Sequence, residues 1–70
     1  MSASQREHRI RALAYRIHQL TGSQDAQANW YRAATLVDTY PYHDFDVRKV
    51  WDRYEIFLVN KDSRHCRFPL

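Results

Sequence analysis

The segment Ala14–Ala34, AYRIHQLTGSQDAQANWYRAA, contains the signals that decide the fold. It begins within an apolar pattern of helical spacing, is interrupted at Gly22, and continues into a second such pattern that contains Trp30. Gly22 is the only glycine of the chain. A glycine just past the last apolar residue of a helix is typical of the left-handed residue that ends it. We therefore expect a helical hairpin whose two arms meet near Gly22.

The arm before Gly22 is predicted to be a helix over residues 5–21. Its apolar residues recur every three or four positions, which at about 100° per residue places them on one face. These residues are Ile10, Leu13, Ala14, Ile17 and Leu20. Ser4 is the expected N-cap, because Glu7 follows three residues later in the spacing of a capping box.

The arm after Gly22 is predicted to be a helix over residues 24–40, with Ser23 as its N-cap. Small side chains and one large ring share its expected buried face: Ala26, Trp30, Ala33, Val37 and Tyr40. Alanines allow a neighbouring helix to approach, so Trp30 is predicted to fill the core between the helices. Pro41 ends the helix, because the residue before a proline is disfavoured in the helical region.

A third helix is predicted over residues 46–59. The apolar residues there again follow a helical spacing: Val47, Val50, Trp51, Tyr54, Phe57 and Leu58. On this pattern Trp51 is also a core residue. Residues 54–59 would suit a strand as well, since they are rich in aromatic and β-branched side chains. The sequence thus leaves open whether residues 54–68 form a helix plus tail or a hairpin.

The favoured architecture is all-α: a small three-helix domain, spanning residues 1–70 as one unit, with an extended basic tail over residues 60–70. Seventy residues bury only about 60% of the surface that the unfolded chain exposes. No apolar run approaches the roughly 20 residues that a membrane-spanning helix needs. The N-terminus does not resemble a signal peptide, and Cys66 is the only cysteine, which excludes an internal disulfide. We expect a cytoplasmic protein without a membrane segment.

The first half of the chain contains a recognisable pattern, namely Ile10-Arg11, Ala14-Tyr15, Gly22, Trp30 and Ala33. Over about residues 8–37 this pattern resembles a bacterial family of short domains of unknown function. The chain departs from that family at His18, where the family tends to have Trp, and in a shorter segment between Gly22 and Trp30. The resemblance implies a helical hairpin. It implies no activity and no functional residues.

No group of residues has the spacing of a catalytic or metal site. His43, Asp44 and Asp46 are close in sequence, as are His65 and Cys66, but neither set shows a paired spacing such as Cys-x-x-Cys. Solvated polar loops explain both sets better. We predict that the protein is not an enzyme and has no cofactor and no metal.

Several aromatic and basic residues lie outside the predicted buried faces and are expected to bind a partner. They are Tyr31, Tyr42, Phe45, Arg64, Arg67 and Phe68. Tyrosine, phenylalanine and arginine together commonly anchor protein interfaces. The net charge of +3 is concentrated near the two ends, which favours an acidic partner surface. The predicted function is a small protein-binding module that serves as a regulator or accessory subunit of a larger complex.

The alternative is a minor nucleic-acid-binding protein. It would use the basic faces of the first and third predicted helices, with Arg9, Arg16, Arg48, Lys49 and Arg53. A helix-turn-helix protein places a polar recognition helix after its turn. The second predicted helix is instead rich in alanine and has Arg32 as its only basic residue. The sequence therefore favours protein binding over nucleic-acid binding.

Overall fold

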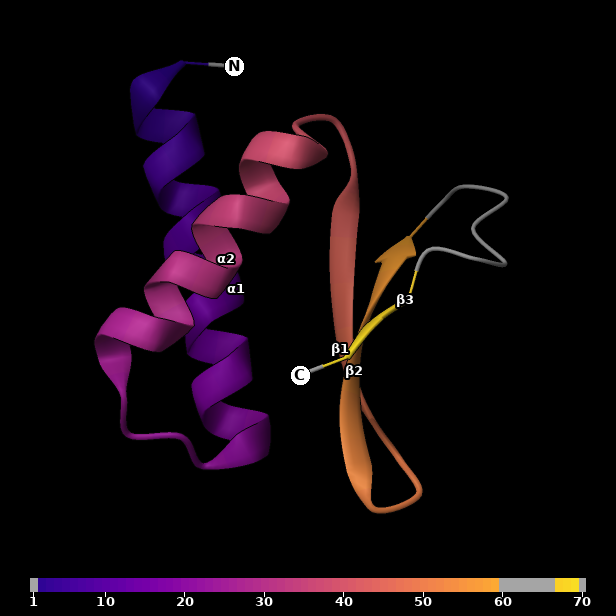
Figure 1. Cartoon of the computed structure of the whole chain (residues 1–70). Helices are drawn as coiled ribbons and strands as arrows, with labels where there is room; N and C mark the ends of the chain where they lie inside the picture. Colours follow the sequence, from indigo (N-terminus) through magenta and orange to yellow (C-terminus); the bar gives the residue numbers. More distant parts are fainter. Residues whose placement is uncertain (1, 60–66, 70) are drawn as a thin grey trace.

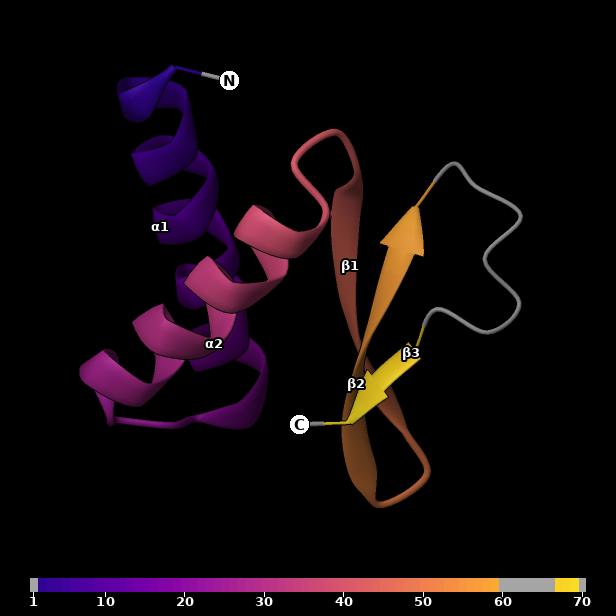
Figure 2. The same ribbon diagram turned by 45° about the horizontal axis from the view of Figure 1, so that its top comes forward.

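The computed structural model describes residues 2–59 and 67–69 and contains two helices followed by three strands (Figure 1). The elements are α1 (Ala3–Thr21), α2 (Ala26–Thr39), β1 (Asp44–Val50), β2 (Arg53–Val59) and β3 (Arg67–Pro69). The strands form an antiparallel sheet in the order β1-β2-β3. The helices form a layer on one side of this sheet (Figures 1 and 2). The all-α prediction is therefore wrong, and the fold is α+β.

The helical hairpin lies where the sequence predicts it. Gly22 has a left-handed backbone with φ of 73°, and its N–H donates to the carbonyl of His18 at 2.9 Å. The two N-caps differ from the prediction. The hydroxyl of Ser2 accepts from the Gln5 N–H at 3.2 Å and caps α1, and the Asp25 carboxylate accepts from the Ala28 N–H at 3.0 Å and caps α2.

The predicted third helix is a β-hairpin. In the register of β1 and β2, Val47 lies opposite Ile56 and Phe45 lies opposite Leu58. Asp46 separates Phe45 from Val47 on β1, and Phe57 separates Ile56 from Leu58 on β2, so these four side chains share one face with the period of a strand. Val47, Val50, Tyr54 and Phe57 happen to be spaced three or four residues apart, so the same segment also matches a helical pattern. The turn consists of Trp51 and Asp52. It contains neither glycine nor asparagine, the residues that usually indicate a two-residue hairpin turn in a sequence.

Part of the predicted extended tail is a strand. Its residues Arg67–Pro69 form β3, which pairs with β2 so that Phe68 lies opposite Ile56. For residues 54–68 the sequence allowed either a helix plus tail or a hairpin. The antiparallel pairing of β2 with β3 agrees with the hairpin. The rest of the predicted tail, including Arg64, lies outside the described residues.

The core fills the space between the helices and the inner face of the sheet. Its buried members are Ile10, Leu13, Ile17, Ala33, Leu36, Val37, Val47 and Ile56. Tyr40, Phe45 and Phe68 pack against the edge of this cluster. Ile56 is only 1% exposed, and burying an isoleucine side chain contributes about 1.5–3 kcal/mol. No helix in the described part of the chain is long and apolar enough to cross a membrane.

Neither tryptophan is a core residue, contrary to the prediction. Trp30 is 38% exposed because α2 turns Asn29 toward the core instead. Asn29 is tolerated there because its Nδ2 donates to the carbonyl of Ser23 at 3.2 Å. Trp51 is 90% exposed at the tip of the β1–β2 hairpin.

Trp51 also has an unfavourable backbone conformation. Its φ is 62°, and within residues 2–59 and 67–69 it is the only residue other than glycine with a positive φ. A left-handed backbone costs a side chain with a Cβ roughly 1–2 kcal/mol. The hairpin turn therefore carries strain that a glycine would relieve.

Replacing Trp51 with glycine and, separately, with alanine tests this strain. At a negative φ, glycine would be the less stable of the two by about 0.5–1 kcal/mol. At the observed positive φ the order reverses, so we expect Trp51→Gly to be more stable than Trp51→Ala. Urea denaturation of the two variants measures the difference. An alanine variant that is the more stable would contradict the left-handed turn.

Candidate protein-binding surface

The outward face of α2 exposes an aromatic ring. Because α2 buries Asn29, Ala33 and Val37, a residue two positions after Asn29 points to the opposite side of the helix. That residue is Tyr31, which is 74% exposed. It is one of the residues predicted from the sequence to bind a partner.

A groove of about 400 Å³ runs between α2 and the strands β2 and β3. It is lined by Ala28, Tyr31, Arg32, Thr35, Leu36, Ile56, Phe68 and Pro69. The buried side chains of Leu36 and Ile56 connect the groove to the core, and Tyr31 lies on its exposed side. Its base is therefore apolar, and Tyr31 at its rim is exposed.

β3 supplies the second wall of this groove. Phe68 is held opposite Ile56 by strand pairing, and its ring centroid lies 5.5 Å from that of Tyr40. The fold thereby brings together Tyr31 and Phe68, two predicted partner-binding residues that are far apart in the sequence.

A second hollow, of about 590 Å³, lies on the other side of Tyr31. It is lined by Asp25, Gln27, Ala28, Trp30, Tyr31 and Ala34. Tyr31 thus separates two hollows and can contact a ligand in either. We call the residues of the groove the α2–β3 surface.

Arg32 gives this surface a positive charge. Within residues 2–59 and 67–69, Arg32 makes no ion pair. Asp38 is the only acidic residue of α2 and lies near the C-terminal end of the helix. It is paired with Arg6 of α1. The two bonds are Arg6 Nε to Oδ1 at 2.7 Å and Arg6 Nη2 to Oδ2 at 2.9 Å. The hydrogen bond from Arg6 lowers the pKa of Asp38, which keeps that carboxylate ionised and bound to α1.

The other predicted partner-binding residues lie elsewhere. Tyr42 is 85% exposed in the loop between α2 and β1. Phe45 belongs to β1 and packs against the core, so the expectation that it has no role in the core is wrong. Arg67 lies in β3, and Arg64 falls outside the part of the chain that the structure describes.

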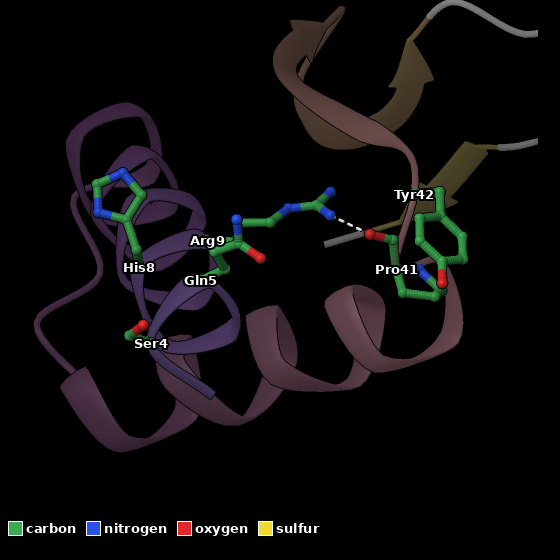
Figure 3. Close-up of a pocket in the computed structure, with 6 residues that line it drawn as sticks. All are labelled: Ser4, Gln5, His8, Arg9, Pro41 and Tyr42. Atoms are coloured by element: carbon green, nitrogen blue, oxygen red, sulfur yellow. Dashed lines mark hydrogen bonds between the residues drawn. The ribbon is translucent and has the colours of Figure 1, made fainter. Parts of the chain in front are cut away.

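Tyr42 borders a separate hollow of about 600 Å³ between α1 and the loop that joins α2 to β1 (Figure 3). The other lining residues are Ser4, Gln5, His8, Arg9 and Pro41. Figure 3 shows Arg9 extending from α1 toward Pro41. The Arg9 guanidinium donates to the carbonyl oxygens of Pro41 and His43 and so fixes the loop to α1.

The residues predicted to bind nucleic acid are mostly engaged within the chain. Asp46 accepts from Arg16 at 3.1 Å and from Arg48 at 2.6 Å, and Arg53 pairs with Glu55 at 3.2 Å. Arg48 also lies 5.5 Å from the ring centroid of Phe57. Arg9 binds loop carbonyls, as described above, and Lys49 is exposed on β1.

These basic residues do not share one face. Arg9 and Arg16 belong to α1, whereas Arg48 and Arg53 lie on the outer side of the hairpin, opposite to Val47 and Ile56. The basic face of a third helix does not exist, because that helix is a hairpin.

Sequence reasoning missed the groove itself, including Arg32, Leu36, Ile56 and Pro69. Only Arg32 carries a local signal, as a cation next to a tyrosine that lies off the apolar stripe. The described residues contain no cluster of three potential metal ligands. Comparisons with protein-family models, with curated proteins and with solved structures gave no match. The resemblance to a bacterial family stays a prediction.

The Arg6–Asp38 pair predicts a pH dependence. Because the folded state lowers the pKa of Asp38, the pair stabilises the fold above the ordinary carboxyl pKa near 3.9, and this is lost as the pH falls through the lowered value. Arg6→Gln should raise the pKa of Asp38 toward its ordinary value. NMR titration of the Asp38 carboxyl carbon measures this, with Arg11→Gln as the control. An unchanged Asp38 titration in Arg6→Gln would show that the pair does not form in solution.

Proposed function

We propose that the protein is a non-enzymatic binding module that accepts a segment of another protein on the α2–β3 surface. The observation that carries this proposal is the position of Tyr31, an exposed ring beside an apolar groove with a cation at its rim. Exposed tyrosines next to arginine are frequent energetic centres of protein interfaces. Such a module would serve as a regulator or as an accessory subunit of a larger complex.

The groove indicates the chemistry of the partner. An apolar side chain of the partner would pack on Leu36, Ile56 and Phe68, and a neighbouring carboxylate would pair with Arg32. Arg32 would then gain the ion pair that it lacks within the described residues. The partner segment is therefore apolar with a flanking acidic residue, in agreement with the net positive charge of the chain.

The ion pairs within the chain weigh against nucleic-acid binding. Binding to nucleic acid requires arginines and lysines that can contact phosphates, and the affinity then falls steeply with salt. Arg16, Arg48 and Arg53 already pair with carboxylates.

We place the protein in the cytoplasm, since its single Cys66 suits a reducing compartment.

Quantitative affinity purification tests the proposal. Tagged parent protein is used to capture partners from a lysate of its source organism, alongside Tyr31→Ala and Arg32→Glu. Tyr15→Ala is the matched control, because Tyr15 is an exposed tyrosine on α1 outside the α2–β3 surface. We expect a partner that Tyr15→Ala retains and the other two variants lose. With the purified partner, Tyr31→Ala should weaken binding by more than about 1 kcal/mol in calorimetry.

Circular dichroism establishes that each variant keeps the secondary structure of the parent. A partner captured equally by all four proteins would disprove the assignment of this surface. Capture of nucleic acid that survives about 0.2 M salt would favour the alternative function.

A further inference from the structure

β1 exposes the longer unpaired edge of the sheet. Its seven residues pair with β2 on one side, and no strand of the described chain pairs with the other side. The opposite edge is β3, which has three residues and ends at Pro69. Proline cannot donate a backbone hydrogen bond, so β3 is a poor template for a further strand. β1 is the edge to which a strand can be added.

The hairpin register fixes which backbone groups of β1 are available. A two-residue turn closes with a hydrogen bond between the residues that flank it, here Val50 and Arg53. Along an antiparallel strand, successive residues direct their backbone groups alternately to the two sides. The residues whose N–H and C=O groups point to the outer edge are therefore Phe45, Val47 and Lys49.

The sequence of β1, DFDVRKV, is complementary to itself when it runs antiparallel. Acidic residues occupy its first half and basic residues its second half, with Val47 at the centre. In a pairing centred on Val47, Asp46 of one copy lies opposite Arg48 of the other, and Phe45 lies opposite Lys49. Opposite charges directly across a strand pair are stabilising.

Electrostatics selects this register over its neighbours. The alternation of backbone groups allows only pairings that join outward-pointing residues of the two copies. Shifting the second strand by two residues in one direction places Asp46 opposite Asp46. Shifting it by two residues in the other direction places Arg48 opposite Arg48. Like charges directly opposite each other are destabilising. Of these registers, only the one centred on Val47 pairs opposite charges without placing like charges opposite each other.

We propose that two copies of this chain associate through antiparallel pairing of their β1 strands, centred on Val47. The two sheets become one continuous sheet, with the helices of both copies on the same face. This interface lies at the opposite edge of the sheet from β3, so it is independent of the partner-binding surface proposed above.

The space beside the start of β1 is partly open. A hollow of about 390 Å³ lies between α1 and the start of β1, lined in part by Ala12, Asp44 and Phe45. Lys49 of the second copy falls opposite Phe45 at this hollow, and exposed Asp44 lies next to it. Asp46 already contacts Arg16 and Arg48 of its own chain, and Arg48 of the second copy completes a cluster of alternating charge.

The dimer also accounts for the strained tip of the hairpin. In this register Trp51 of the second copy lies opposite His43, beside the hollow between α1 and the α2–β1 loop (Figure 3). Trp51 is 90% exposed in the single chain, and Tyr42 at that hollow is 85% exposed. The two most exposed aromatic rings of the described chain thus meet across the interface. Backbone strain is commonly retained where it serves a function.

The first test is charge complementation between copies, measured by sedimentation equilibrium of the full chain. The parent should dimerise at about 100 μM, and Asp46→Arg or Arg48→Asp alone should each weaken the dimer by about tenfold or more. An equimolar mixture of the two variants should form a heterodimer, because every arginine then faces an aspartate. A parent that is monomeric up to about 1 mM, or a mixture that does not associate, would overturn the proposal.

The second test uses a variant that leaves the ladder between β1 and β2 intact. Lys49→Pro removes an N–H that points to the outer edge, so it should abolish dimerisation while the circular dichroism spectrum is unchanged. Trp51 emission, recorded in a Trp30→Phe background, should shift to shorter wavelength as the parent concentration rises. A dimer that persists in Lys49→Pro, or an emission that does not change on dimerisation, would disprove pairing through β1.

Discussion

The packing of Ile56 against the apolar stripes of the two helices is the contact on which the rest of the structure depends. Ile56 lies in the central strand, between Val47 of β1 and Phe68 of β3, and is almost completely buried. An isolated hairpin is marginal in water, and short isolated helices are marginal too. Each layer of this protein is therefore stable only while it covers the other. A chain this small buries only about 60% of the surface that the unfolded chain exposes, so much of its surface stays exposed.

The binding surface follows from this packing. α2 must direct Asn29, Ala33 and Val37 at the core, and that orientation leaves Tyr31 exposed on the far side of the helix. β3 is short and pairs with only three residues of β2, and the space between it and α2 is a groove with an apolar base. The same geometry leaves β1 with an outer edge that no strand of the described residues pairs, and the proposed dimer would use this edge. Two separate edges of one small sheet can thus serve two different contacts.

The sequence predicts the first half of this fold and not the second. The stripe of α1 and the single Gly22 give the helical hairpin from local chemistry alone, because period and turn agree there. Between Val47 and Leu58, helical spacing and strand alternation fit the same residues, and only pairing with β3 decides between them. Trp51 and Asp52 form a turn without the residues that normally mark one. Tyr31 was identifiable because it lies off the stripe, whereas Ile56 and Phe68 meet it only through tertiary contacts.

The most direct test of the hairpin is NMR of the backbone between Asp44 and Val59. In this register Val47 and Ile56 form a pair without mutual hydrogen bonds, as do Lys49 and Tyr54, and their Cα atoms are about 4.5 Å apart. The account predicts strong cross-strand contacts between the Hα protons of Val47 and Ile56. A series of contacts between residues three positions apart along this segment would instead establish a helix and contradict the account.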